Sequence, residues 1–276
     1  MPIINYVGGV CLRVRGVHEW LLAVVLIVSV FPSGATQRVY MTSLEWPPYS
    51  GEELEGYGLS VAVAREAFAA MGYELIIEFK PWVRAVALAS KSDKYVGYFP
   101  EYYFKTDDFV FSDSIGSGPL GLVENIKFPI KWSSLEDLTL YRIGVVQGYV
   151  NTAEFDLLVE EGMIQVEASA NDIRNIYKVA KGRLDAAVID SNVLDYLIGI
   201  DPRSDMLGNR LKMNSRLLES KELYLAFKNT PEGHNWRDVF NEGLKKIDVS
   251  SIVERYNRYL STTNGIHSPI VPFRAN

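Results

Sequence analysis

The sequence predicts an α/β protein of two lobes, each a mostly parallel sheet flanked by helices, joined by a two-segment hinge. Short apolar runs alternate with stretches whose apolar residues recur at helical spacing, which is typical of parallel sheets. The alternation is interrupted between 112 and 124 by a Gly-Ser-Gly-Pro segment, and a further apolar run at 223–227 follows a polar stretch. We therefore expect the chain to cross between the lobes near 120–124 and again near 218–225.

The first lobe is expected to open in the order strand, helix, strand, helix, strand. The apolar run at 38–44 is followed by Trp46-Pro47-Pro48-Tyr49, which ends a strand because proline donates no ladder hydrogen bond. Apolar residues then recur at helical spacing from Val61 to Met71, which predicts a helix that ends near Gly72. The remaining elements expected here are a strand at 74–79, a short helix at 81–89 and a strand at 95–99.

The second half of the chain repeats the alternation. Its most informative run is 184–190 (Leu-Asp-Ala-Ala-Val-Ile-Asp), which ends in a carboxylate and leads straight into a helical pattern at 191–198. An apolar run of this kind suits a strand that is buried on both faces. The other expected elements are strands at 142–146, 164–167 and 223–227, helices at 151–161 and 171–181, and two closing helices, the second opening on a capping box at Ser251 and Glu254.

Four parts are expected along the chain. A basic start, a short apolar core and small residues before a cut after Ala35 are typical of a secretory signal peptide at 1–35. The apolar block is shorter than the ~20 residues that span a bilayer, and an uncleaved N-terminal anchor is the alternative. We expect lobe 1 at 36–122 and 223–262, lobe 2 at 123–222, and a flexible tail at 263–276.

Composition narrows the functional classes. The net charge of −6 over 276 residues gives no indication of a basic surface for nucleic acid. Cys11, the single cysteine, lies in the segment expected to be removed, so a mature chain without thiol chemistry is expected. The sequence also shows no Ser-His-Asp order, metal-ligand spacing or phosphate loop. We therefore expect no cofactor, no metal and no nucleic-acid partner, and a monomer in the periplasm.

Asp190 is the first candidate for a binding site. Ligands of open α/β sheets bind beyond the carboxyl ends of the strands, where Asp190 is expected to lie. The alternative is that Asp190 only caps the following helix, since aspartate is a preferred N-cap. Gly148 has a similar pair of interpretations, as part of a loop of backbone donors or as a plain tight turn.

Several segments, in the expected order, resemble the periplasmic solute-binding proteins of family 3, the polar amino acid type. Behind the signal peptide these are an opening strand that ends in Pro-Pro-Tyr49, Phe-Ser-Asp-Ser-Ile at 111–115, Ile-Gly-Val-Val-Gln-Gly at 143–148 and the run to Asp190. The resemblance spans roughly 38–260 and implies a type II periplasmic binding protein-like fold. Pro-Trp-Val-Arg at 81–84 resembles a divergent branch of that family.

The resemblance also implies how a zwitterion would be held. Asp190 falls on the aspartate that receives the α-ammonium group, and 147–151 falls on the loop whose amides face the α-carboxylate. Lys105 stands where the family has an arginine clamp; lysine keeps the charge but lacks the planar fork, and Arg84 is the alternative guanidinium. The expected ligand-binding residues are Trp46, Tyr49, Arg84, Tyr98, Lys105, Gln147, Gly148, Tyr149, Asn151 and Asp190.

The resemblance implies capture of a small polar solute, an amino acid or related zwitterion, for an inner-membrane transporter or receptor. No catalytic residue is assigned. Two alternatives stay open: a dehydratase-like periplasmic enzyme on the same scaffold, with Glu101 or Asp190 as the general acid, and a ligand-sensing module without a transporter. The sequence does not name the solute, although aromatic residues near the expected cleft hint at an aromatic or cationic side chain.

Overall fold

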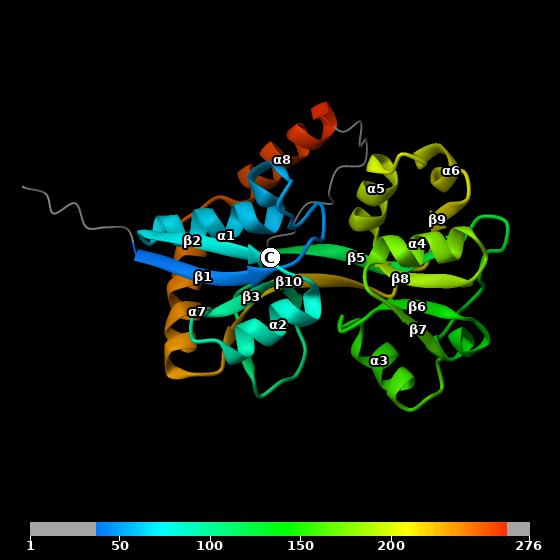
Figure 1. Ribbon diagram of the computed structural model, residues 1–276, viewed down its shortest axis with the longest axis horizontal. Helices are drawn as coiled ribbons and strands as arrows, with labels where there is room; N and C mark the ends of the chain where they lie inside the picture. Colours follow the sequence, from blue (N-terminus) through cyan, green and yellow to red (C-terminus); the bar gives the residue numbers. More distant parts are fainter. Residues whose placement is uncertain (1–36, 264–276) are drawn as a thin grey trace, which may run out of the picture. The chain divides into compact units, whose positions relative to one another are not determined.

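A computed structural model describes residues 37–263 of the chain (Figure 1). The expected signal peptide, Cys11 and the tail beyond Thr263 lie outside the described residues. None of the helices in the described range is both long enough and apolar enough to cross a membrane.

The strands form one continuous sheet that runs through both lobes. Along this sheet the order is β2-β1-β3-β10-β5-β8-β6-β7, with β4 added on β10 and β9 on β5. Pairing is parallel among β1, β2 and β3 and again among β6, β7 and β8, and it is antiparallel wherever β5 or β10 takes part. The strands are β1 (Gln37–Ser43), β2 (Tyr73–Phe79), β3 (Gly97–Tyr102), β4 (Phe109–Phe111), β5 (Gly116–Asn125), β6 (Ile143–Val146), β7 (Val166–Ser169), β8 (Ala186–Asp190), β9 (Leu211–Met213) and β10 (Glu219–Lys228).

Helices flank each half of the sheet (Figure 1). In lobe 1, α1 packs against β2 and α7, while α2 packs against β1 and β3. In lobe 2, α4 contacts β6 and β8, and α5 contacts β5. The helices are α1 (Leu59–Ala70), α2 (Trp82–Lys91), α3 (Ala153–Glu160), α4 (Asp172–Ala180), α5 (Ser191–Ile200), α6 (Ser204–Gly208), α7 (Pro231–Leu244) and α8 (Val249–Thr263), with the 3-10 helices η1 (Glu55–Tyr57) and η2 (Leu135–Leu140).

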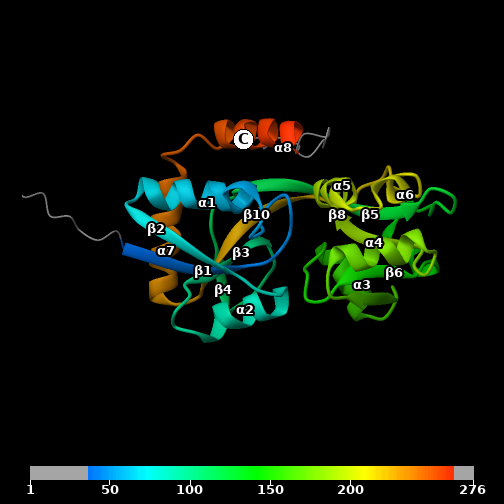
Figure 2. The same ribbon diagram turned by 45° about the horizontal axis from the view of Figure 1, so that its top comes forward.

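Two long strands connect the lobes. Strands β5 and β10 pair with each other from Gly116–Leu223 to Leu120–Glu219. Beyond this stretch β5 pairs with β8 of lobe 2, and β10 pairs with β3 of lobe 1 (Figure 2). The expected two-lobed α/β architecture is therefore confirmed, whereas the hinge role of these two strands and the borders at 122/123 and 222/223 stay predictions.

Strand β8 shows why the apolar run was informative. Each of its five residues is buried, as expected for a strand with elements packed on both faces. The strand lies between β5 and β6, so the carboxylate at its end is carried to the edge that faces the other lobe. The core of the sheet thus positions Asp190.

The capping box expected at Ser251 and Glu254 is wrong. Helix α8 begins at Val249, and the Asp248 carboxylate accepts hydrogen bonds from the backbone and hydroxyl of Ser251 at 3.2 and 2.6 Å. Aspartate caps a helix as well as serine does, so the helix begins two residues before Ser251. It continues to Thr263, the first residue of the expected tail.

Candidate functional site

Aromatic residues follow the first strand at the edge where the two lobes meet. Trp46 and Tyr49 come directly after β1 in a tight bend, in which Tyr49 N–H donates to the Trp46 carbonyl at 3.0 Å. Their rings lie 4.7 Å apart, and both side chains are buried. The bend places them beyond the carboxyl end of a parallel strand, where open α/β sheets bind ligands.

Asp190 both caps a helix and faces the opposite lobe. Its Oδ1 accepts from the backbone N–H groups of Asn192 and Val193 at 2.8 and 3.2 Å, which caps α5. The Tyr49 hydroxyl lies 3.2 Å from each carboxylate oxygen of Asp190, although the two residues belong to different lobes. The two interpretations of Asp190 are therefore compatible, because Oδ1 caps the helix while both carboxylate oxygens contact Tyr49 of the other lobe.

Tyr49 is held in this contact by a third group. The Asn192 side-chain amide donates to the Tyr49 hydroxyl oxygen at 2.7 Å, so the hydroxyl proton is left to point at Asp190. Burial, followed by the Asp190 charge, raises the pKa of Tyr49 well above its ordinary value. The neutral tyrosine thus makes the contact that an ammonium group of a ligand would make more strongly.

The hinge strand leaves room for this contact only because it carries glycine. A methyl group added at Gly118 in β5 would lie 1.9 Å from Oδ2 of Asp190 and 2.4 Å from the Tyr49 hydroxyl. Atoms that are not bonded to each other cannot lie this close. A side chain at position 118 would therefore force Asp190 or Tyr49 to shift.

Asp190 is one of three buried carboxyl groups with raised pKa values. Burial raises the pKa of Asp190 to about 7, and burial together with the Asp190 charge raises the pKa of Asp172 to about 7. Burial also raises the pKa of Glu101 to about 8, although the Tyr102 N–H and the Tyr98 hydroxyl donate to it at 2.8 and 3.2 Å. None of these three carboxyl groups is in an ion pair among the described residues.

Aromatic rings from both lobes close around a cavity of ≈ 20 Å³. Tyr149 of lobe 2 lies 6.4 Å from the Trp46 ring and 5.8 Å from the Trp82 ring of lobe 1. The Trp82 Nε1–H donates to the Gly148 carbonyl at 2.8 Å, a second hydrogen bond between the lobes. The residues that define this inter-lobe cluster are Trp46, Tyr49, Trp82, Glu101, Tyr102, Tyr149, Asp172 and Asp190.

No protein-family model and no curated protein matches the chain. Solved structures do. An ancestral arginine-binding protein bound to arginine is 16% identical, with a TM-score of 0.65 over 79% of this chain and 97% of that one. A histidine kinase sensor domain with similarity to periplasmic binding proteins is 17% identical, with a TM-score of 0.65 over 86% of this chain and 99% of that one.

A third similar structure is an ancestral amino acid-binding protein described as a precursor of cyclohexadienyl dehydratase. It is 16% identical, with a TM-score of 0.61 over 82% of this chain and 95% of that one. The chain has the two-lobed fold of the periplasmic binding proteins. At these identities the likeness establishes the fold, which agrees with the architecture expected from the sequence.

Within the periplasmic binding protein fold, the site residues expected from the sequence fall into two groups. Trp46, Tyr49, Tyr149 and Asp190 meet in the inter-lobe cluster, and Gly148 touches it through its carbonyl. Tyr98 is fully buried one layer behind, with its ring 5.3 Å from that of Trp82. The others, Arg84, Lys105, Gln147 and Asn151, lie outside it.

The two cations proposed to hold a carboxylate are exposed outside the cluster. Arg84 is exposed on the first turn of α2. Lys105 is also exposed and lines a separate hollow together with Arg216 and Lys221. In this structure, therefore, neither Arg84 nor Lys105 brings a positive charge to Asp190.

Three backbone donors of the loop at 147–151 are used within the chain. Gln147 N–H donates to Ser169, Tyr149 N–H to Val146, and Asn151 N–H to the Asp156 carboxylate, at 2.9, 3.2 and 2.8 Å. The Asn151 side-chain amide also donates to Asp156, at 2.7 Å. An anion at this loop would have to replace those hydrogen bonds.

Sequence reasoning did not include Asp172 or Tyr102 among the ligand-binding residues. Asp172 opens α4 shortly after β7, so the rule that selected Asp190, a carboxylate beyond the end of a parallel strand, also applies to it. Tyr102 carries no comparable signal, because its position depends on how β3 pairs with β10. Among the described residues, no group of three His, Cys, Asp or Glu side chains is arranged to hold a metal ion.

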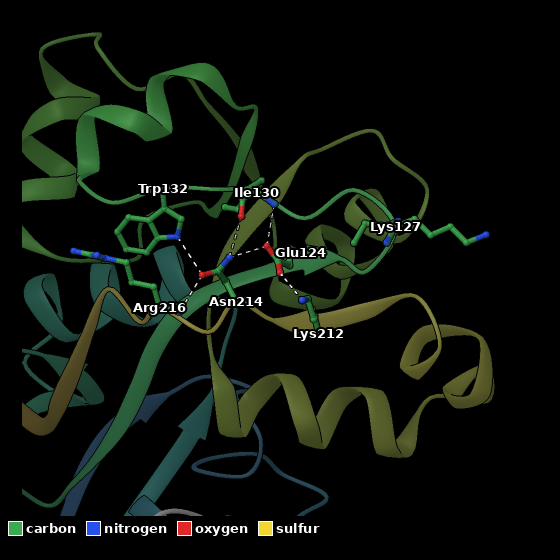
Figure 3. Close-up of polar contacts among 8 residues, drawn as sticks. Glu124, Lys127, Ile130, Trp132, Lys212, Asn214 and Arg216 are labelled. Atoms are coloured by element: carbon green, nitrogen blue, oxygen red, sulfur yellow. Dashed lines mark hydrogen bonds and ion pairs between the residues drawn. The ribbon is translucent and has the colours of Figure 1, made fainter.

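A fourth buried carboxylate, Glu124, shows what a structural acid looks like in this protein. It accepts from Ile130 N–H at 3.0 Å and from the Asn214 amide at 2.7 Å, and it pairs with Lys212 at 3.3 Å (Figure 3). Asn214 Oδ1 in turn accepts from Trp132 Nε1 at 3.3 Å. This network ties the returning chain to β5 and balances its own charge, unlike Asp172 and Asp190.

Proposed function

We propose that the chain is a solute-binding protein, a divergent relative of the family 3 type, that encloses a small polar solute between its lobes. The observation that carries the proposal is the contact of Tyr49 with Asp190 across the gap. It lies beside buried carboxyl groups that have no ion-pair partner among the described residues. A buried charge left unpaired is costly, so such groups favour a site that a partner completes.

Closure of the lobes follows from the hinge. Strands β5 and β10 carry the chain between lobes, so small backbone changes along 116–120 and 219–223 would separate Tyr49 from Asp190. In the open form, the solute enters the cleft together with its hydration water. On closure Asp190 meets the positive end of the solute in place of the Tyr49 hydroxyl, and exclusion of water strengthens that contact.

The proposed solute contacts are Trp46 and Tyr49 from lobe 1 and Tyr149 and Asp190 from lobe 2. We also propose export to the periplasm after cleavage near Ala35, and delivery of the solute to an inner-membrane transporter or receptor. The likeness to amino acid-binding proteins and to a sensor domain supports both destinations equally. We propose that the protein acts as a monomer, because the two lobes of one chain together supply the residues of one site.

A thermal-shift screen of the exported protein against amino acids, polyamines and organic acids tests the proposal. A ligand at 100-fold its Kd stabilises the folded state by ~2.7 kcal/mol, a clear rise in melting temperature. Asp190→Ala should abolish the shift that an amine-bearing ligand produces, while Glu161→Gln, which removes an exposed carboxylate of the same lobe, should retain it. The absence of any stabilising compound would contradict the proposal.

A dehydratase-like enzyme is the second candidate, and Glu101 is the observation that favours it. A carboxyl group with a pKa of about 8 is protonated at neutral pH, so it can donate a proton to a departing hydroxyl group. Glu101 also lines the cavity. Product formation from cyclic prephenate-like hydroxy acids, lost in Glu101→Gln but not in Glu161→Gln, would establish turnover; unchanged substrate would leave binding alone.

A further inference from the structure

The charge balance of the inter-lobe cluster narrows the ligand class. We propose that the site takes an organic cation that lacks a carboxylate, an amine or guanidinium compound rather than a zwitterionic amino acid. This inference rests on the proposed function, that a solute binds between the lobes, and it goes further by naming the chemistry of that solute.

Negative groups dominate the cluster. The Asp190 charge disfavours ionisation of Asp172, and the charges of Asp172 and of Glu101 from the other lobe disfavour ionisation of Tyr149. Glu124 has Lys212 beside it, whereas Asp172 and Asp190 have no ion pair among the described residues. A ligand that brings one positive charge relieves this repulsion, and one that also brings a carboxylate restores it.

A hydroxyl group without a partner points to the same place. The Tyr102 side chain is 6% exposed, and its oxygen has no hydrogen-bond partner among the described residues. It lines the cavity and lies within electrostatic range of Asp190, Tyr49, Asp172 and Tyr149. A buried hydroxyl oxygen left unbonded is unfavourable, and an N–H of a bound cation would satisfy it.

The walls of the cavity suit a cation. The ring faces and edges of Trp46, Trp82, Tyr102 and Tyr149 surround it, with Trp46 and Tyr102 centroids 5.9 Å apart. Aromatic rings attract ammonium and guanidinium groups, most strongly when water is excluded. The faces of these rings do not attract a carboxylate in the same way.

The positive groups near the cluster are already committed or lie outside it. Lys221 sits 5.4 Å from the centroid of the Tyr102 ring, pairs with Glu219 at 3.6 Å, and its charge favours ionisation of Glu101. Arg84 and Lys105 are exposed outside the cluster, and the amides of Gln147, Tyr149 and Asn151 donate within the chain. A ligand carboxylate would therefore meet three acids, and none of these cations or amides would be ready to pair with it.

Matched pairs that differ only by a carboxylate test the inference directly. Calorimetry at pH 8 compares agmatine with arginine, putrescine with ornithine, cadaverine with lysine, tyramine with tyrosine, and histamine with histidine. We expect at least one amine to bind ten times more tightly than its parent amino acid. An amino acid that binds as tightly as its amine, or more tightly, overturns the cation assignment but leaves the proposed function standing.

If none of these amines and none of their parent amino acids binds, the inference is overturned. If amino acids, polyamines and organic acids all fail in the wider thermal-shift screen as well, the proposed function fails with it. The two failures are thus distinguishable.

Isosteric variants locate the effect in the cluster. Asp172→Asn and Tyr102→Phe should each weaken binding of the preferred amine about tenfold, while Glu161→Gln leaves it unchanged. Asp172→Asn should also reduce the preference for the amine over its parent amino acid, an effect that a merely structural role would not produce. An unchanged affinity and preference in correctly folded Asp172→Asn would overturn the assignment.

Discussion

Individual residues show most clearly how the proposed binding site differs from a structural polar network in this protein. Asp190 and Glu124 are both buried acids of lobe 2, at opposite ends of the β5–β8 pair, but Glu124 has a lysine and two N–H donors, whereas Asp190 has two backbone amides and a tyrosine. The Asp190 site therefore lacks the positive charge that the Glu124 site contains. We attribute the missing charge to the solute.

Two substitutions at Asp190 separate its tasks. Asp190→Asn should keep α5 capped, because asparagine caps as well as aspartate, but should weaken amine binding about 10- to 100-fold by removing the charge. Asp190→Ala should lose the cap as well and destabilise the protein by ~1 kcal/mol. Calorimetry and urea unfolding measure the two effects. Equal binding by wild type and Asp190→Asn would contradict the assigned role.

Gly118→Ala tests the close approach beneath this contact. The added methyl group would overlap Asp190 and the Tyr49 hydroxyl, so we expect a loss of ~1–3 kcal/mol in unfolding free energy and weaker closure. Gly121→Ala, in the same strand, is a control whose methyl group would meet flexible ends of Met213 and Leu217 at 2.9 and 3.0 Å. A similar stability for both variants would count against the steric argument.

The candidate site was predictable from the sequence only in part. Position along a strand located Asp190, and the proline break located Trp46 and Tyr49, because both signals are local. Tyr102 and its unpartnered hydroxyl depend on long-range pairing of β3 with β10, which no local pattern reports. The resemblance suggested that Lys105 holds an anion, but its side chain is exposed outside the cluster. Sequence spacing alone does not indicate whether a side chain is exposed or lines a site.

At the scale of elements, periodicity was a good guide to long helices and buried strands. The helices around α1 and α4 and the strands β1, β6 and β8 agree with the sequence expectations to within a few residues. The three-residue strands β4 and β9 and the short helix α6 were not predicted, since so few residues show no period. The union of both lobes in one sheet was also not predicted, because β5 and β10 are far apart in sequence.

Helix α2 offers a test of how the lobes are held together. Trp82→Phe keeps an aromatic ring but removes the N–H that donates to the Gly148 carbonyl, so the closed form should lose one inter-lobe hydrogen bond. We expect faster amide exchange at 147–151 and a several-fold faster ligand dissociation, consistent with ~1 kcal/mol for such a bond. Trp236→Phe, whose indole N–H contacts Glu232 within lobe 1, is the matched control and should leave both rates unchanged.

At the scale of the whole molecule, the buried acids make stability depend on pH. The folded-state pKa values of about 7 for Asp172 and Asp190 and about 8 for Glu101 exceed those of free carboxyl groups. Between about pH 4 and pH 8 the folded protein therefore binds more protons than the unfolded chain, and stability falls as pH rises. Carboxyl groups with lowered pKa values, such as Glu78 and Asp185, act only below this window.

The melting temperature of the unliganded protein should thus decrease from about pH 5.5 to about pH 8.5. Asp172→Asn should flatten this decrease, since asparagine does not titrate, whereas Glu161→Gln should not. Differential scanning calorimetry across this range measures both. A melting temperature that rises with pH would mean that the three acids are ionised at no cost in the folded state.

The affinity for a cationic ligand should depend on pH in the opposite sense to the stability. A bound cation favours the ionised form of the acids, so its affinity should increase as the pH rises. At pH 7, where Asp172 and Asp190 are about half protonated, entry of an amine should expel protons, and its affinity should fall as the pH is lowered from about 8 to about 6. Calorimetry in buffers of different ionisation enthalpy counts the released protons. An anionic solute would instead take up protons and bind more tightly at low pH, so the sign of this one measurement distinguishes a site built for positive charge from one built for negative charge.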